Sequence, residues 1–164
     1  MPFQKQVNIT QAPAVAGQFA STNPRHAALS VQGGFVAGAN GVTVGLWAWA
    51  DTSTNSLLSN TGTGVPTGFM ARTEQALITT YLTEFGNTIP AGFPAADIFT
   101  GGDFWATNAG AGAVTVGLKA FANLTTGVTT FAAAGATVAG AIETKFFAAT
   151  AGAAGELIKI TNNI

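Results

Sequence analysis

The apolar residues of this chain fall in short runs that alternate with polar residues and are separated by turn-forming residues. The clearest run is Val42–Ala50 (VTVGLWAWA). β-Branched and aromatic residues favour strands, and the Gly-, Asn- and Thr-rich segments between the runs favour turns. The pattern predicts an all-β fold of about eight or nine strands, arranged as a β-sandwich, a jelly roll or a barrel. The other runs are Val65–Ala71, Gln75–Phe85, Asp103–Thr107, Val114–Asn123, Val128–Ala132, Ala141–Ala148 and Glu156–Thr161.

The first 26 residues follow a different pattern and are expected to form an extended N-terminal arm. Val7 and Ile9 alternate with polar neighbours, as in one short strand. Pro13 and Pro24 then keep the chain extended. Such an arm either frays, lies on a neighbouring subunit or folds back on its own sandwich. We therefore expect an arm over residues 1–26 and a single β-sandwich domain over residues 27–164.

The chain also repeats itself. Val42–Ala50 returns 72 residues later as Val114–Ala122 (VTVGLKAFA), with seven of nine positions identical. Gly33–Ala37 has a looser echo in Gly101–Ala106. Low-complexity composition makes chance matches easier, and the alternative is two related half-domains packed face to face, each supplying a similar hairpin. A glycine inside each repeated run predicts a bulge or a close backbone approach.

Charged side chains are scarce. They make up 8% of the residues, thirteen in 164, whereas an average soluble domain is about 25% charged. A lone globule with so little charge would be poorly protected against association. We infer that much of the surface is meant to contact other proteins rather than water, and that the charges gather on the side that faces solvent.

The side chains that carry chemistry form no recognisable motif. The single histidine, His26, is expected in a turn or hinge, and there is no cysteine, so no metal site and no cofactor are predicted. Asp51–Asn55 holds too few carboxylates for a calcium loop. The six basic residues are scattered, which excludes a nucleic-acid patch. Residues 120–142 are uncharged but rich in Thr, Asn and Gly, which argues against a membrane span.

Several segments taken in order resemble the structural cement (capsid decoration) proteins of tailed bacteriophages. These segments are Val7–Arg25, Gly34–Gly45, Leu77–Leu82, Ile89–Phe93 and Gly101–Trp105. The likeness covers most of the chain to about residue 132 and is sparser after it. Its motifs are structural rather than catalytic.

The resemblance implies a jelly-roll-like β fold, made in the host cytoplasm and bound to the outer face of an icosahedral head. It implies contact with the major capsid protein, bridging of capsid subunits, and a small homo-oligomer, a dimer in preference to a trimer. The arm would add a strand to a neighbour's sheet edge through Val7 and Ile9, with Arg25 anchoring on a capsid carboxylate. The residues expected to contact the capsid or another subunit are Val7, Ile9, Phe19, Arg25, Trp47, Trp49 and Trp105.

Three other readings stay open at this point. A self-assembling fibre or surface-layer subunit shares the low charge. A carbohydrate-binding module would use exposed Trp47, Trp49 or Trp105. An enzyme would need a polar cleft that unites two acids, such as Asp51 and Asp103. Nothing in the sequence favours the enzyme.

Overall fold

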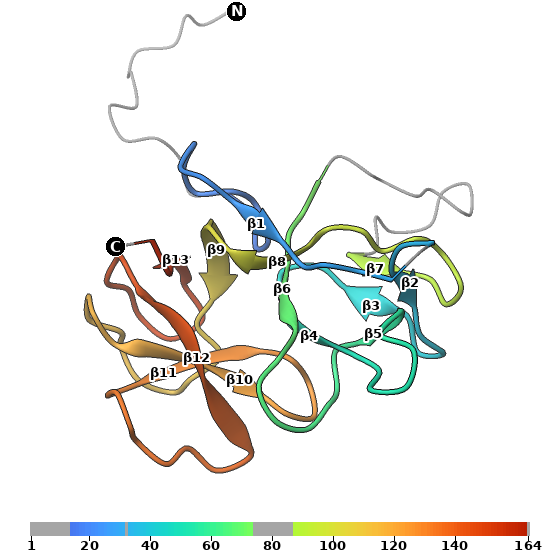
Figure 1. Cartoon of the computed structure of the whole chain (residues 1–164). Coiled ribbons are helices and arrows are strands. Elements are labelled where there is room, and N and C mark those ends of the chain that lie inside the picture. The colour runs from blue at the N-terminus through green and yellow to red at the C-terminus, as the bar shows by residue number, and fades with distance from the viewer. Residues whose placement is uncertain (1–13, 32, 74–86, 164) are drawn as a thin grey trace, which may run out of the picture.

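The protein is built from short strands, as the sequence pattern predicts. A computed structural model describes residues 14–31, 33–73 and 87–163. The all-β prediction is confirmed, and the strands form a β-sandwich of mixed sheets (Figure 1). The strands are β1 (His26–Ala27), β2 (Val36–Ala37), β3 (Val42–Thr43), β4 (Trp47–Ala50), β5 (Leu57–Ser59), β6 (Gly68–Met70), β7 (Thr88–Ile89), β8 (Ile98–Gly101), β9 (Asp103–Thr107), β10 (Lys119–Asn123), β11 (Thr129–Ala132), β12 (Ala141–Ala148) and β13 (Leu157–Thr161).

The described residues contain thirteen strands, more than the eight or nine expected, because five short strands (β1, β2, β5, β7 and β8) lie between the predicted runs and one predicted run is divided in two. Gly45, at φ 78°, separates β3 from β4 inside the run that was predicted as one strand. Gly117, at φ 90°, delays the start of β10 in the same way. The runs over β9 and β12 have the predicted bounds. The run predicted over Gln75–Phe85 lies outside the described residues.

Two sheets hold most of the strands, and they have the same strand order. The six-stranded sheet runs β1-β8-β6-β4-β5-β2, and the five-stranded sheet runs β9-β13-β12-β10-β11. β2 pairs in parallel with β5 through Val36 and Leu57. Seventy-two residues later, Asn108 forms a parallel bridge with Thr129 of β11. Asn108 therefore lies beside β11 in the same way that β2, the sixth strand of the first sheet, lies beside β5.

Backbone hydrogen bonds repeat in the same places. The Gly45 N–H donates to the Met70 carbonyl, and the Met70 N–H donates to the Leu46 carbonyl, at 2.7 and 2.9 Å. Gly117 donates to Ala148 at 2.9 Å, and Ala148 donates back to Leu118 at 2.8 Å. The repeated sequence thus marks two structural repeats, as predicted. We call residues 26–101 the first repeat and residues 103–161 the second.

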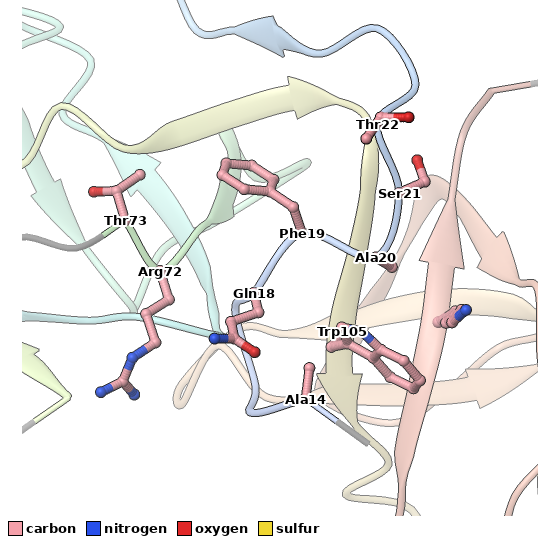
Figure 2. Close-up of a pocket in the computed structure, with 10 residues that line it drawn as sticks. Ala14, Gln18, Phe19, Ala20, Ser21, Thr22, Arg72, Thr73 and Trp105 are labelled. Carbon is pink, nitrogen blue, oxygen red and sulfur yellow. The ribbon is translucent and has the colours of Figure 1, made fainter. Parts of the chain in front are cut away.

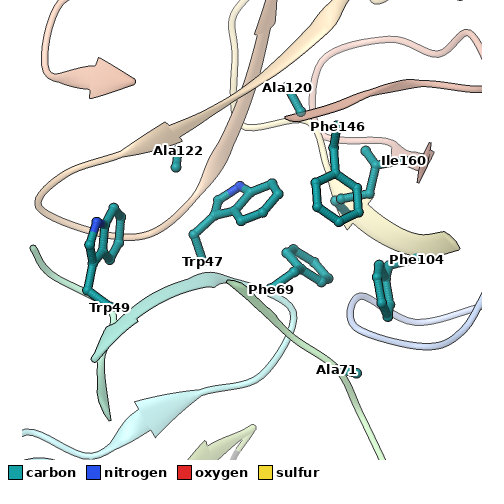
Figure 3. Close-up of a cluster of buried hydrophobic side chains, with 10 residues drawn as sticks. Trp47, Trp49, Phe69, Ala71, Phe104, Ala120, Ala122, Phe146 and Ile160 are labelled. Carbon is teal, nitrogen blue, oxygen red and sulfur yellow. The ribbon is translucent and has the colours of Figure 1, made fainter. Parts of the chain in front are cut away.

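The two repeats pack asymmetrically. Each sheet has two faces, and we call the face of the first repeat's sheet that is turned toward the second repeat its outer face. The side chains of Trp47 and Trp49 on β4 and of Phe69 on β6 lie on this outer face (Figure 3). They meet the inner face of the second repeat, formed by Phe104, Ala106, Ala120, Ala122, Phe146 and Ile160. Rings in this core contact edge to face, Trp47 on Phe69 and on Phe146 at centroid distances of 5.1 and 5.3 Å.

The inner face of the first repeat has a core of its own. Met70 and Ile98 on neighbouring strands pack there with Val42 and Leu58, and loop residues such as Phe35 close it. A smaller cluster of Val114, Ala148 and Ile158 fills the equivalent part of the second repeat. The predicted half-domains therefore meet outer face to inner face.

Residues 14–26 lie against the second repeat of the same chain. The Gly17 N–H donates to the Trp105 carbonyl at 2.7 Å, and the Trp105 N–H donates to the Gln18 carbonyl at 2.9 Å. Phe19 forms a bridge with Phe104 and packs at 5.4 Å on the ring of Phe99. This part of the arm covers the free edge of β9, whereas residues 1–13 lie outside the described residues.

The asymmetric packing predicts a specific sensitivity at Gly127. Its φ is +69°, and a Cβ added there would lie 2.5 Å from the carbonyl oxygen of Trp47. We expect Gly127→Ala to lower the free energy of unfolding by about 3 kcal/mol, because both backbone strain and a clash result. Urea denaturation followed by tryptophan fluorescence measures the change.

The matched control is Gly135→Ala. Gly135 also has positive φ, +74°, but nothing lies within 4 Å of an added Cβ. The free energy of unfolding of this variant should fall only by the cost of backbone strain, about 1 kcal/mol. Equal losses for the two variants would contradict the close packing of the two repeats.

Candidate interaction surface

One face of the five-stranded sheet carries most of the lysines. Lys119, Lys145 and Lys159 alternate with inward-facing residues on β10, β12 and β13. The Lys119 ammonium lies 3.5 Å from the Lys145 carbonyl oxygen. Lys159 is paired across the strands with Trp105 and sits 5.0 Å from the centre of its ring. We call Lys119, Lys145 and Lys159 the lysine face.

A groove of about 680 Å³ borders this face (Figure 2). Its walls come from the arm, from the residues that follow β6 and from β9 and β13, and they include Phe19, Arg72, Trp105 and Lys159. The Arg72 guanidinium donates to the Asn87 side chain at 2.7 Å. Aromatic surface beside two cations can hold an extended acidic or neutral chain.

Asp103 ties the arm to the C-terminal segment. Its carboxylate accepts hydrogen bonds from Ser21 and Asn23 of the arm, from Thr161 at the end of β13 and from Asn163 just after it. Partial burial raises the pKa of this carboxyl, but the four hydrogen bonds outweigh it, and the pKa lies below the ordinary aspartate value. The negative charge of Asp103 therefore stabilises the fold by joining the arm to the C-terminal segment.

The carboxylate of Asp51 also has a structural role, in the loop between β4 and β5. It accepts hydrogen bonds from the Ser53 hydroxyl and from the backbone N–H groups of Leu57, Thr54 and Ser56, at 2.7 to 2.9 Å. These bonds, the one from Ser53 first, hold the pKa of Asp51 far below its usual range. The carboxylate closes its own hairpin and has no second acid among these partners.

The sequence-predicted contact residues fall into three groups. Val7 and Ile9 lie outside the described residues. Phe19, Arg25 and Trp105 are partly or largely exposed and lie together around the arm, with the Arg25 guanidinium carbon 3.9 Å from the centre of the Phe19 ring.

Trp47 and Trp49 form the third group, and they are 1% and 6% exposed. Both fill the core between the repeats, so their rings cannot contact another molecule in this fold. Of the three tryptophans considered for sugar binding, Trp105 alone is left at the surface. The placement of Trp47 follows from packing between repeats, which the alternation within one strand does not reveal.

Within the described ranges no three His, Asp or Glu side chains gather as metal ligands. His26, expected in a turn or hinge, instead begins strand β1 and pairs with Gly101. No helix among the described residues is long and apolar enough to cross a membrane.

One exposed apolar region was not singled out from the sequence. Leu29 is 90% exposed and Leu57 is 48% exposed, and both belong to the first repeat. A single exposed leucine is unremarkable in a sequence, because about half of any surface is apolar. The available signal was the repeat itself, since the hairpin that contains Leu57 has a counterpart 72 residues later.

One solved chain, from the structure described as "The capsid of Myoviridae Phage XM1", matches with a TM-score of 0.60 and 17% identity. The match covers 99% of this chain and 98% of that one, and it shows a shared fold. No curated protein matches the chain significantly.

The family follows from the sequence match. The model of the XM1 gp53 minor capsid protein family matches residues 3–162. The chain therefore belongs to this family of phage capsid structural proteins, which confirms the resemblance to capsid-associated proteins. Its place is in the virion.

The network around Asp103 predicts a dependence on pH. Because the folded pKa is depressed, the carboxylate stabilises the fold above the unfolded pKa of about 3.9, and this contribution is lost as pH falls through the folded pKa. We expect the stability difference between wild type and Asp103→Asn to be largest near neutral pH and to shrink below about pH 4. Chemical denaturation over a pH series measures it.

The effect of Asp51 is common to both proteins in this comparison and cancels in the difference. A difference in stability that stays constant from neutral pH to pH 3 would contradict the assigned role of the Asp103 charge.

Proposed function

We propose that this chain is a non-enzymatic cement protein that binds the outer face of the phage head and bridges major capsid subunits. The observation that carries the proposal is the match of nearly the whole chain to a minor capsid family. Scarce charge supports it, because the centres of protein interfaces are depleted in charged residues. The structural use of Asp51 and Asp103 supports the absence of catalysis.

The proposed mechanism is mass action. A protein that binds the assembled shell but not its dissociated subunits stabilises the shell by the free energy of binding. Each contact can be small, because a copy that touches two subunits gains from effective concentration. We include in the proposal a small homo-oligomer, a dimer in preference to a trimer.

The arm is the proposed tether. Residues 14–20 are held on β9, so the chain that precedes Ala14 starts at the groove beside Trp105 and Lys159. From there Val7 and Ile9 would add a strand to a neighbour's sheet edge, and Arg25, already oriented on Phe19, would donate to a carboxylate of the shell. Main-chain pairing of this kind supplies affinity without charge.

The direct test of function uses heads assembled without this protein. Added back in excess, the purified chain should co-sediment with the heads at a saturating ratio and raise the temperature at which they release DNA. Filaments formed by the protein alone would favour the fibre reading, and absence of binding to heads would contradict the proposal.

Deleting residues 2–13 tests the tether separately. This deletion leaves Gly17 and Phe19 on β9, so the thermal unfolding of the free protein should stay within about 2 °C of wild type. Occupancy on heads at a limiting protein concentration should fall about tenfold. Unchanged occupancy would show that the arm does not bridge subunits.

A further inference from the structure

The hairpin between β4 and β5 is the structural counterpart of the hairpin between β10 and β11. The Asn55 N–H donates to the Asp51 carbonyl at 3.0 Å, and the Gly127 N–H donates to the Asn123 carbonyl at 2.9 Å. Asn55 and Gly127 are 72 residues apart, and both have positive φ, 50° and 69°. The same turn is therefore built twice.

In the second repeat this hairpin packs against the first repeat. The Trp47 N–H donates to the Gly127 carbonyl at 2.8 Å, and the Gly62 N–H donates to the Leu124 carbonyl at 3.0 Å. The Trp47 indole N–H donates to the Thr129 hydroxyl at 3.0 Å. Only glycine fits at position 127, because the Trp47 carbonyl occupies the place of a side chain.

In the first repeat no described residue covers the equivalent hairpin as the first repeat covers residues 123–127. Asn55 and Leu57 stand where Gly127 and Thr129 stand in the second repeat, and Leu57 is 48% exposed whereas Thr129 is 2% exposed. The tight turn has room for a side chain at position 55, because Asn55 is exposed. The hairpin that serves as a packing element in one repeat is free in the other.

Other apolar side chains extend this exposed region. The Asn55 amide donates to the Leu29 carbonyl at 3.4 Å, which places Leu29 beside the hairpin. Val36 pairs with Leu57 on one side and with Pro94, next to Phe93, on the other. We call Leu29, Asn55, Leu57 and Phe93 the docking end.

Among the residues that the structure describes, the docking end carries no free charge. From residue 26 to residue 71 the only charged side chain is Asp51, and its carboxylate is consumed by hydrogen bonds inside the hairpin. The lysine face belongs to the other sheet, and β2 lies at the opposite end of the molecule from β13 (Figure 1). Within the described residues the molecule thus has an apolar end without free charge and, on the other sheet, a charged face. That face carries the three lysines together with Glu143, which pairs with Phe121 on β10.

From this polarity we infer that the docking end is the surface that seats the protein on the shell, against an uncharged apolar patch of the capsid subunits. The inference rests on the proposed function. A neutral, apolar surface is complementary to a partner of the same kind, because a charge buried opposite it would lose its hydration without compensation.

A second copy of the chain does not fit as the occupant. The surface that receives the buried hairpin is centred on Trp47, and its counterpart in the second repeat is Lys119, on the lysine face. The docking end exposes on the order of a few hundred Å² of apolar surface, whereas a stable pair takes about 800 Å² from each partner. Many copies on one lattice can use so small a contact.

The experiment compares Leu57→Lys and Leu29→Lys with Val116→Lys. Val116 is 65% exposed and lies in the second repeat, away from the docking end. All three changes add one lysine at an exposed position, so folding should be preserved, and thermal unfolding verifies it. We expect the docking-end variants to bind heads at least about tenfold more weakly, and Val116→Lys to bind within about twofold of wild type.

The outcomes separate this inference from the proposed function. If wild type binds heads and the docking-end variants bind equally well, the surface is misassigned. If Val116→Lys loses as much, the effect is one of added charge, and the inference fails. If light scattering shows that Leu57→Lys turns a dimer into a monomer, the docking end is covered by a second copy. Failure of wild type to bind heads contradicts the proposed function itself.

Discussion

The structure depends on the burial of the first repeat's aromatic outer face in the inner face of the second. Trp47 is central to this packing: its ring contacts Phe69 and Phe146, its indole N–H bonds to Thr129, and its backbone bonds to Gly127. Neither repeat is long enough to close a large core by itself. Joined in this way, they form one sandwich whose two sheets share the same strand order.

This packing also determines what is left at the surface. Two copies of one motif that associate outer face to inner face use different surfaces of each copy, so they leave unmatched surfaces at both ends. One unmatched surface is the hairpin with Asn55 and Leu57, and the other carries Lys119. The apolar end and the lysine face thus both result from the asymmetric packing of the two repeats. Such an arrangement suits a protein that has one side against a partner and the other side in solvent.

Much of the fold could be predicted from the sequence, because strand runs and turn glycines act locally. The runs over β9 and β12 have the predicted bounds, and the repeat at Val42 and Val114 marks equivalent hydrogen bonds. The number of strands is larger than expected, because two- to four-residue strands such as β2 and β7 are too short to show alternation and because Gly45, with positive φ, divides one run.

The candidate site was harder to predict. Alternation shows that Trp47 and Trp49 belong to one face of a strand, but it does not show whether that face meets solvent or the other repeat. Leu29 and Leu57 were not singled out for the opposite reason: the repeat marks their hairpin as one of two copies, but it does not show which copy is covered. Long-range packing between repeats decides both, and local sequence does not encode it.

The central claim is that an apolar end of the first repeat faces the shell and the lysine face of the second repeat faces solvent. Cryo-electron microscopy of the intact particle tests it most directly, at a resolution that traces β-strands. The account predicts density on the outer surface of the head with Leu29 and Leu57 against capsid subunits and with Lys145 exposed to solvent. A map with the lysine face against the shell and the Leu57 hairpin in solvent would contradict it.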